Sequence, residues 1–258
     1  MLYIEQLPSN KPMHSLRTIN VFHFLLPIGA AIGLASSALA APITVPNFSF
    51  EAPEAVDGDS VYPPTGWTPG GSGYNQFGVT DFDNSSYHGS HGDNAPLPGT
   101  AHGGQTASIG IQSLMSVGHL TSSSGLGLVA DNTVYRLTVA LGNALNFAHP
   151  DTSTIQLLVD GAVVSSRSMA ATAIPDGTFT DFSTSFTTAA VGDPRTGGML
   201  AIRLQVSSSN PSFETGDWHT DFDNVRLDAT PVPEPSTFLL VAAALVGLGI
   251  TRIRRRRG

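Results

Sequence analysis

The stretch TVYRLTVALG, residues 133–142, alternates apolar and polar side chains. One face carries only apolar side chains, at Tyr135, Leu137, Val139 and Leu141. The opposite face carries Arg136 and Thr138. Because successive side chains of a strand point to opposite faces, this period of two predicts a β-strand with one buried face.

The same period recurs along the chain. Residues 154–161, TIQLLVDG, place Ile155, Leu157 and Val159 on one face and end in Asp-Gly, the signal for a two-residue hairpin turn into residues 162–168. Three more segments alternate in the same way, at residues 178–188, 198–206 and 221–229. No comparable run has helical spacing, so the sequence predicts an all-β fold.

Residues 54–104 are dense in Gly, Pro, Ser, Asn and Asp, and predict long loops. Short strands are expected nearby, at residues 74–79 and 105–110. We find no internal repeat and no linker that would divide the region, which predicts one β-sandwich domain over residues 41–230.

Charge is low and unevenly distributed. Charged residues make up 12% of the 258-residue chain, against about 25% in average domains. Residues 41–230 hold five arginines, no lysine and 18 acidic residues, a formal charge of −13. Such an excess repels phosphate backbones and excludes nucleic-acid binding. The absence of cysteine excludes disulfides, thiolate zinc sites and a cysteine nucleophile.

The N-terminal residues 1–40 have the pattern of a secretory signal peptide. An apolar stretch at residues 21–34 follows basic residues and leads to Ala38 and Ala40, which form an A-x-A site. We expect signal peptidase to cleave after Ala40. Met13 is an alternative initiator, and an uncut membrane anchor is the alternative to cleavage.

Residues 231–258 combine Pro233-Glu234-Pro235 with an apolar segment at 236–253 and a basic cluster of four consecutive residues, Arg254, Arg255, Arg256 and Arg257. At about 1.5 Å per residue the apolar segment spans roughly 27 Å, close to a hydrocarbon core of about 30 Å, and predicts a transmembrane helix. The positive-inside bias keeps the four arginines cytoplasmic and the domain outside.

This tail resembles the PEP-CTERM sorting signal of Gram-negative bacteria, which exosortases process. The resemblance implies export through the inner membrane, transient retention by the tail, cleavage near Pro233 to Pro235, and delivery to the cell surface or an exopolysaccharide matrix. The alternative is a plain tail anchor whose prolines begin the helix.

The central domain resembles the galactose-binding-like jelly roll of carbohydrate-binding modules, on the segments NFSFEAP (47–53), PPTGW (63–67) and DWHTDFDNVRLDA (217–229). The resemblance implies a structural calcium ion joining the first and last strands. Its matching positions here are Glu51 and Asp223, with Asp221 as a third ligand. The alternative is that these acids are solvated residues at strand ends.

A second polar cluster lies in the loops. Residues 81–94 contain Asp81, Asp83, Asn84, His88, His91 and Asp93, and His102 follows. Two imidazoles and a carboxylate can bind zinc. This run lacks the regular spacing of metal motifs, so we expect a solvated polar loop.

Aromatic residues are the candidates for stacking on sugar rings. We expect Trp67 to be a core residue beneath the Pro63-Pro64 turn. Four residues remain as platforms for a polysaccharide: Tyr62, Tyr74, Tyr87 and Trp218.

The sequence offers no strong catalytic motif. Asp221 with Asp223 is weak evidence for glycoside hydrolysis in an Asp-rich chain, and no G-x-S-x-G is present. We therefore expect a non-enzymatic surface protein that binds polysaccharide or has a structural role in a matrix. The alternative is a secreted hydrolase acting on matrix polysaccharide.

Overall fold

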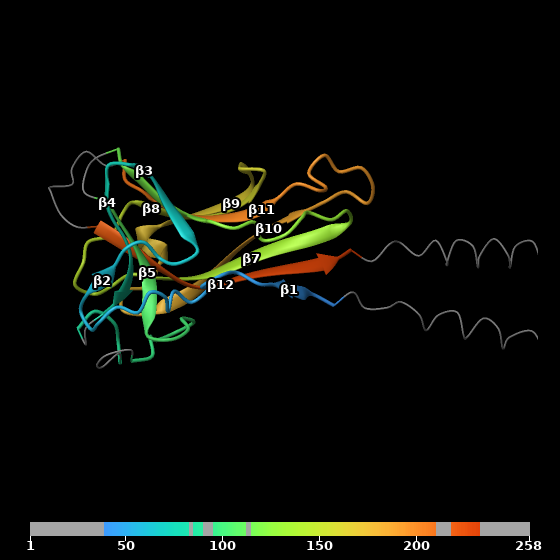
Figure 1. Ribbon diagram of the computed structural model, residues 1–258. Coiled ribbons are helices and arrows are strands. Elements are labelled where there is room, and N and C mark those ends of the chain that lie inside the picture. Colours follow the sequence, from blue (N-terminus) through green and yellow to red (C-terminus); the bar gives the residue numbers. More distant parts are fainter. Residues whose placement is uncertain (1–38, 83–84, 90–94, 112–114, 210–217, 233–258) are drawn as a thin grey trace, which may run out of the picture. The chain divides into compact units, whose positions relative to one another are not determined.

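The computed structural model describes residues 39–82, 85–89, 95–111, 115–209 and 218–232. These residues form two antiparallel sheets packed face to face, which confirms the all-β prediction (Figure 1). The described residues contain no helix long and apolar enough to cross a membrane. The predicted signal peptide, apart from its last two residues, and the helix expected at 236–253 lie outside the described residues.

One sheet has seven strands. In spatial order its path runs through β10 (Phe179–Thr187), β7 (Thr133–Gly142), β12 (Trp218–Pro231), β5 (Gln105–Ile111), β4 (Tyr74–Asp81) and β2 (Ser60–Val61). The seventh strand, β1 (Ala41–Ile43), pairs with the C-terminal half of β12, so the first and last strands of the domain lie side by side.

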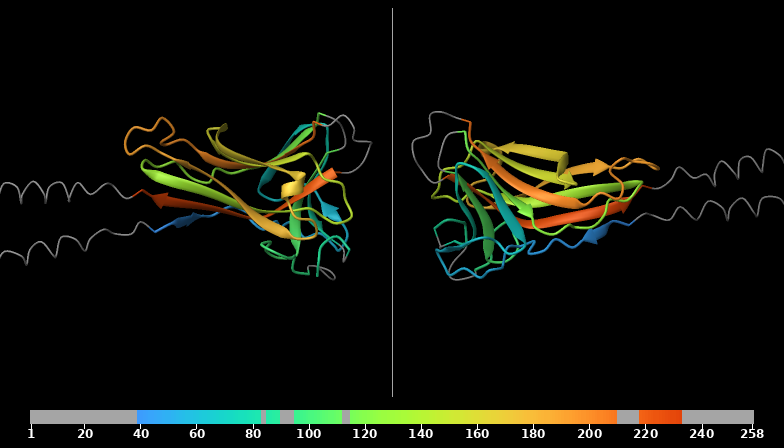
Figure 2. Two further views of the ribbon diagram at one scale, coloured as in Figure 1. Left: turned by 180° about the vertical axis from the view of Figure 1, so that it is seen from behind. Right: turned by 45° about the horizontal axis from the view of Figure 1, so that its top comes forward.

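The other sheet has five strands, in the order β3 (Trp67–Ser72), β6 (Val117–Ser122), β11 (Leu200–Ser207), β8 (Thr152–Val159) and β9 (Ala162–Ala170). A short 3-10 helix, η3 (Ala171–Ala173), follows β9. Figure 2 shows the two layers from behind and from above, with the termini of the described domain at one end.

The core between the sheets is built by the alternation found in the sequence. Leu137, Val139 and Leu141 of β7 are fully buried, and Arg136 is exposed. Leu200, Ile202, Leu204 and Val206 of β11 are likewise fully buried. Burial of these side chains is the main force that holds the layers together.

The predicted hairpin is confirmed. β8 and β9 pair antiparallel around Asp160 and Gly161, whose φ angles are 49° and 79°. Two consecutive positive φ values are what a type I′ turn requires, which explains the Asp-Gly sequence.

Strands β3 and β6 were not predicted. β3 has the sequence WTPGGS, whose proline and glycines are typical of a loop. It forms the edge of the five-stranded sheet, where a proline is tolerated because one side of the strand has no partner.

Strand β12 contains a bulge that reverses its alternation. The ladder between β12 and β7 shifts register between Asp223 and Arg226, and Asn224 has a φ of 44°. Before the bulge Phe222 points into the core, and after it Val225 and Leu227 do. His219, Asp221 and Asp223 therefore project from the outer face of the seven-stranded sheet.

That outer face is covered by the loops after β4 and β7. A second apolar cluster packs on it, formed by Phe82, Tyr87, Leu97, Ala140, Ala144 and Phe179. The polar side chains that β12 places on this face are consequently buried rather than solvated.

Candidate functional site

A buried carboxylate, Asp221, lies at the centre of the covered face. It is 0% exposed and sits in the ladder opposite Ser108 of β5 and Gly142 of β7. Ser108 Oγ donates a hydrogen bond of 2.5 Å to its Oδ1, and Tyr87 Oη donates one of 2.5 Å to its Oδ2. Such short bonds to a carboxylate are charge-assisted and strong.

Tyr87 reaches Asp221 from the covering loop. Its ring is 1% exposed and stacks on Phe179 with centroids 4.8 Å apart. Burial, and then the negative charge of Asp221, raise the pKa of Tyr87 well above its ordinary value. The phenol therefore stays protonated and remains a donor at neutral pH.

His219 lies two residues before Asp221 on the same strand face. Its Nε2 is 3.5 Å from Asp221 Oδ2, and this buried atom makes no hydrogen bond within the described structure. The imidazole ring packs against Phe147, 4.3 Å between centroids, and stacks on Phe82 at 5.7 Å. A buried imidazole backed by a carboxylate has the arrangement of a general acid or base.

A cavity of about 190 Å³ opens beside these residues. Its aromatic wall is formed by Phe82, Phe147 and His219. The rest of the lining is polar apart from Gly58 and consists of Ser60, Gln76, Thr80, Asp81, Ser86 and Ser108. Phe147 is 39% exposed. The cavity thus combines one aromatic wall with several polar side chains that can orient a ligand.

Sequence reasoning did not identify His219, Ser108, Phe82 or Phe147 as site residues. One local signal was present, because His219, Asp221 and Asp223 alternate along a strand and must share a face. Ser108 and Phe147 come from other segments, and nothing local connects them to this face.

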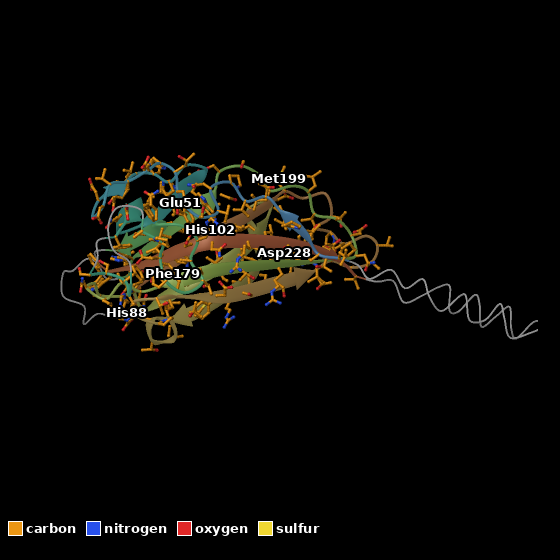
Figure 3. The ribbon with its side chains drawn as sticks, turned by 90° about the horizontal axis from the view of Figure 1, so that it is seen from below. Glu51, His88, His102, Phe179, Met199 and Asp228 are labelled. Atoms are coloured by element: carbon orange, nitrogen blue, oxygen red, sulfur yellow. The ribbon has the colours of Figure 1, made fainter. Side chains whose placement is uncertain are left out.

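Of the three acids assigned to calcium, the structure brings two together. Glu51 Oε1 accepts hydrogen bonds from the backbone N–H of Gly104, at 3.1 Å, and of Gln105, at 3.3 Å. Asp223 Oδ2 accepts one from His102 N, at 2.6 Å. Both carboxylates are thus held by one turn before β5, and Figure 3 shows Glu51 beside His102. Asp221 instead bonds Tyr87 and Ser108.

The Glu51 and Asp223 pair fits a hard cation. Asp223 is fully buried. Burial, and then the charge of Glu51, raise its pKa, and they outweigh the hydrogen bonds from the backbone N–H groups of His102 and Asn224, which lower it. In the described part of the chain no basic side chain forms an ion pair with either acid. Two neighbouring carboxyl groups without a basic ion-pair partner supply oxygen ligands of the kind that calcium takes.

The polar loop shows no metal cluster among its described residues. His88 and His102 are exposed, and Asp81 is buried at the end of β4. No group of three or more His, Cys, Asp or Glu residues gathers as a metal site in the described ranges. Asp83, Asn84, His91 and Asp93 lie outside those ranges.

The four aromatic candidates are dispersed. Tyr87 and Trp218 are buried, at 1% and 4% exposed, so their rings have no face open to a sugar. Tyr62 is 52% exposed, and Tyr74 begins β4 opposite Ile111. Trp67 is a core residue, as predicted, with its ring centroid 5.2 Å from that of Phe50.

The fold is shared with solved enzymes. The Stig cyclase Fisc from Fischerella sp. TAU, in complex with (3Z)-3-(1-methyl-2-pyrrolidinylidene)-3H-indole, matches with a TM-score of 0.58 at 23% identity, over 75% of this chain and 100% of that one. A cyclase from the same organism, in complex with 4-(1H-indol-3-yl)butan-2-one, matches with a TM-score of 0.56 at 21% identity, over 74% and 98%.

A carbohydrate-binding module of the β-sandwich superfamily is a more distant neighbour. Its TM-score is 0.41 at 12% identity, over 67% of this chain and 63% of that one, which is too remote to inform on ligands. No curated protein matches the chain.

The tail prediction is confirmed, because the PEP-CTERM protein-sorting motif matches residues 231–257. The motif marks an exported protein that exosortase processes. Ala40 is described and immediately precedes β1, whereas Ala38 lies outside the described residues. The predicted processing triplet, Pro233, Glu234 and Pro235, also lies outside the described residues. So does the predicted cytoplasmic cluster of Arg254, Arg255, Arg256 and Arg257.

The domain itself matches the HpiC1-like family, described as HpiC1 cyclase, over residues 41–228. This match contradicts the expectation of a non-enzymatic protein, since the family and its solved relatives are cyclases. No local catalytic motif indicated this, because only His219 and Asp221 of the buried cluster share a strand, whereas Tyr87 and Ser108 come from other segments. The chain belongs to the HpiC1-like cyclase family and carries a PEP-CTERM sorting motif behind its domain.

Proposed function

We propose that this chain is an exported cyclase whose reacting centre is His219, positioned by Asp221. The observation that carries this proposal is the buried His219–Asp221 pair at the wall of a cavity with aromatic sides. Asp221 does not line the cavity, so His219 and Ser108 are the members of the cluster that reach a substrate.

In an acid-catalysed ring closure within one molecule, a proton is added and later removed, with no net change. In the proposed reaction the His219 imidazolium donates its proton to a π bond of the substrate. The resulting carbocation forms a carbon–carbon bond with a second π bond, and the neutral imidazole then takes a proton from the ring. The carboxylate of Asp221 stabilises the imidazolium, and general acid–base catalysis of this kind contributes about 10²–10⁴-fold.

The substrate class follows from the cavity wall. Phe147 and Phe82 flank the imidazole, so a flat apolar ring system can lie against them beside the hydroxyl of Ser108. A volume of about 190 Å³ suits a ring system of indole size rather than a segment of polysaccharide. The indole ligands of the related cyclases are therefore suitable probes.

The test uses 4-(1H-indol-3-yl)butan-2-one as a probe of binding and of proton transfer. In calorimetry the purified full chain should bind it saturably, and His219→Ala or Phe147→Ala should weaken binding at least about fivefold. His119→Ala, a histidine change on the five-stranded sheet, is the matched control and should leave binding within about twofold.

Proton transfer is measured as deuterium incorporation into the probe in D₂O, followed by mass spectrometry. The wild-type chain should accelerate incorporation into the indole carbons, and His219→Ala and Asp221→Asn should each abolish at least about 90% of that acceleration. Saturable binding without faster deuterium incorporation would show that the chain binds the probe but does not transfer a proton to it, and would overturn the catalytic assignment. Absence of binding would overturn the substrate class.

We also propose that the chain leaves the cell in two processing steps. Signal peptidase removes residues 1–40 after Ala40, and the inner membrane holds the tail helix until exosortase cuts near Pro233 to Pro235. The sorting motif supports this order. The mass of the mature C-terminus, in strains with and without exosortase, tests the second cut, and an intact tail in both strains would refute it.

We further propose that Glu51 and Asp223 hold a structural calcium ion. Its place would be between the turn before β5 and the bulge of β12, at the base of the loop that carries Tyr87. The ion would neutralise two carboxylates and stabilise that loop, and it takes no part in the proposed proton transfer.

A further inference from the structure

A second site lies away from the cavity, where β9 of the five-stranded sheet meets β10 of the seven-stranded sheet. An open groove of about 640 Å³ is bordered by three arginines, Arg136 of β7, Arg167 of β9 and Arg226 of β12. The rest of its wall is polar and consists of Thr138, Asp181, Ser183, Thr184 and Ser185. We propose that this groove binds the carboxylate groups of an acidic polysaccharide.

Most of the arginines of this acidic domain lie in one groove. Residues 41–230 carry a formal charge of −13 and only five basic side chains, and three of these meet in this groove. The groove wall contains one acid, Asp181, so its lining carries an excess of positive charge in a domain that is otherwise acidic.

Two of the three guanidinium groups have no ion-pair partner among the described residues. Arg226 Nη2 forms an ion pair with Asp181 at 2.5 Å. Across the described residues no carboxylate lies within ion-pair distance of Arg136 or Arg167. Asp228 is the cross-strand neighbour of Arg136, and Figure 3 shows it on β12, yet the two side chains do not pair.

Both free arginines are held in the groove by the same residue of β10. Arg136 Nη2 donates to Ser183 Oγ at 3.4 Å, and Arg167 Nη1 donates to the Ser183 carbonyl at 3.4 Å. The Arg167 guanidinium also lies over the ring of Phe182, 5.1 Å from its centroid. Within the described ranges these contacts use one donor of each guanidinium, and the other donors can bind a ligand.

The ligand class follows from this geometry. A guanidinium matches a carboxylate with two parallel hydrogen bonds, and Ser and Thr hydroxyls suit the hydroxyl groups of a sugar. The groove is wide and open and has no aromatic residue in its wall, unlike the cavity beside His219. Two arginines on different strands favour a chain with repeated carboxylates, such as a polyuronate, over a single small anion.

The experiment measures binding of oligogalacturonate to the purified full chain by calorimetry. We expect saturable binding that weakens about tenfold or more in the double variant Arg136→Gln/Arg167→Gln. The control is Arg203→Gln, which removes one arginine that does not line the groove and should change the dissociation constant less than about twofold. Because the arginines at 254–257 are the same in all variants, the differences report on the domain.

Three further ligands test whether the groove prefers an acidic polysaccharide. A neutral glucan should not bind, and polyglutamate and inorganic sulfate should compete weakly. Absence of oligogalacturonate binding, equal weakening by Arg203→Gln, or equal binding of polyglutamate would each overturn the proposal. Both groove arginines are exposed, so the variants should fold, and the single variants replace the double one if its melting temperature falls.

Discussion

Tyr87 and Asp221 are separated by 134 residues in the chain and joined by a buried hydrogen bond of 2.5 Å. The bond ties the loop after β4 to the last strand and orients the carboxylate that supports His219. Loop closure, burial of the second apolar cluster and assembly of the site therefore depend on one another.

Tyr87→Phe should destabilise the domain although it removes a single oxygen atom. The change leaves Asp221 buried without one of its two strong donors, and the unfolding free energy should fall by about 1–3 kcal/mol. Denaturant unfolding measures the loss, with Tyr62→Phe as the control because Tyr62 is 52% exposed. Equal stability of both variants would show that the bond contributes nothing.

Calcium should raise the melting temperature of the full chain. A ligand at 100 times its dissociation constant stabilises by about 2.7 kcal/mol, which for a domain of this size corresponds to about 5 °C or more. Asp223→Asn should abolish the difference between calcium and chelator, whereas Asp57→Asn, at an exposed loop residue, should preserve it. Identical melting curves of the wild type under both conditions would reject the ion.

Gly103→Ala should disturb the turn that holds Glu51 and Asp223. Gly103 has a φ of 92°, and a Cβ atom there would overlap Glu51 Oε1. Gly197→Ala is the matched control, because its φ is 82° and nothing lies within 4 Å of the added atom. We expect Gly103→Ala to lower the melting temperature by several degrees more than the control, and to reduce any stabilisation by calcium.

The stability contributed by Asp193 should depend on pH. Hydrogen bonds from Arg195, and then from backbone N–H groups of Ala189 and Arg195, hold the pKa of Asp193 well below its usual range. A carboxylate whose folded pKa is lowered stabilises the fold above the ordinary value of about 3.9 and loses that contribution as the pH falls below it. Asp193→Asn should therefore lower the melting temperature at pH 7, and the gap to wild type should narrow towards pH 3. A gap independent of pH would contradict this account.

The strands with regular alternation were predictable because their signal is local. Residues 133–142 and the hairpin at Asp160 and Gly161 have the expected structure, since side-chain period and turn chemistry act over a few residues. β3 was missed because Pro69 is compatible with a strand only at a sheet edge, and edge position depends on which strands assemble.

The bulge of β12 shows a second limit of local patterns. Simple alternation from Asp221 would place Val225 on the same face as Asp221 and Asp223. The extra residue at Asn224 returns Val225 to the core and leaves the acids outside.

By itself, the sequence determined the fold class, the acidic character of the domain and its sorting tail, because each is encoded in contiguous residues. The tertiary structure alone decided which side chains meet. It buried Tyr87 against Asp221, set His219 at a cavity with Phe147, and gathered Arg136 and Arg167 around Ser183. The physical reason is that the burial and pairing of a polar group are set by neighbours from distant strands, which no local pattern specifies.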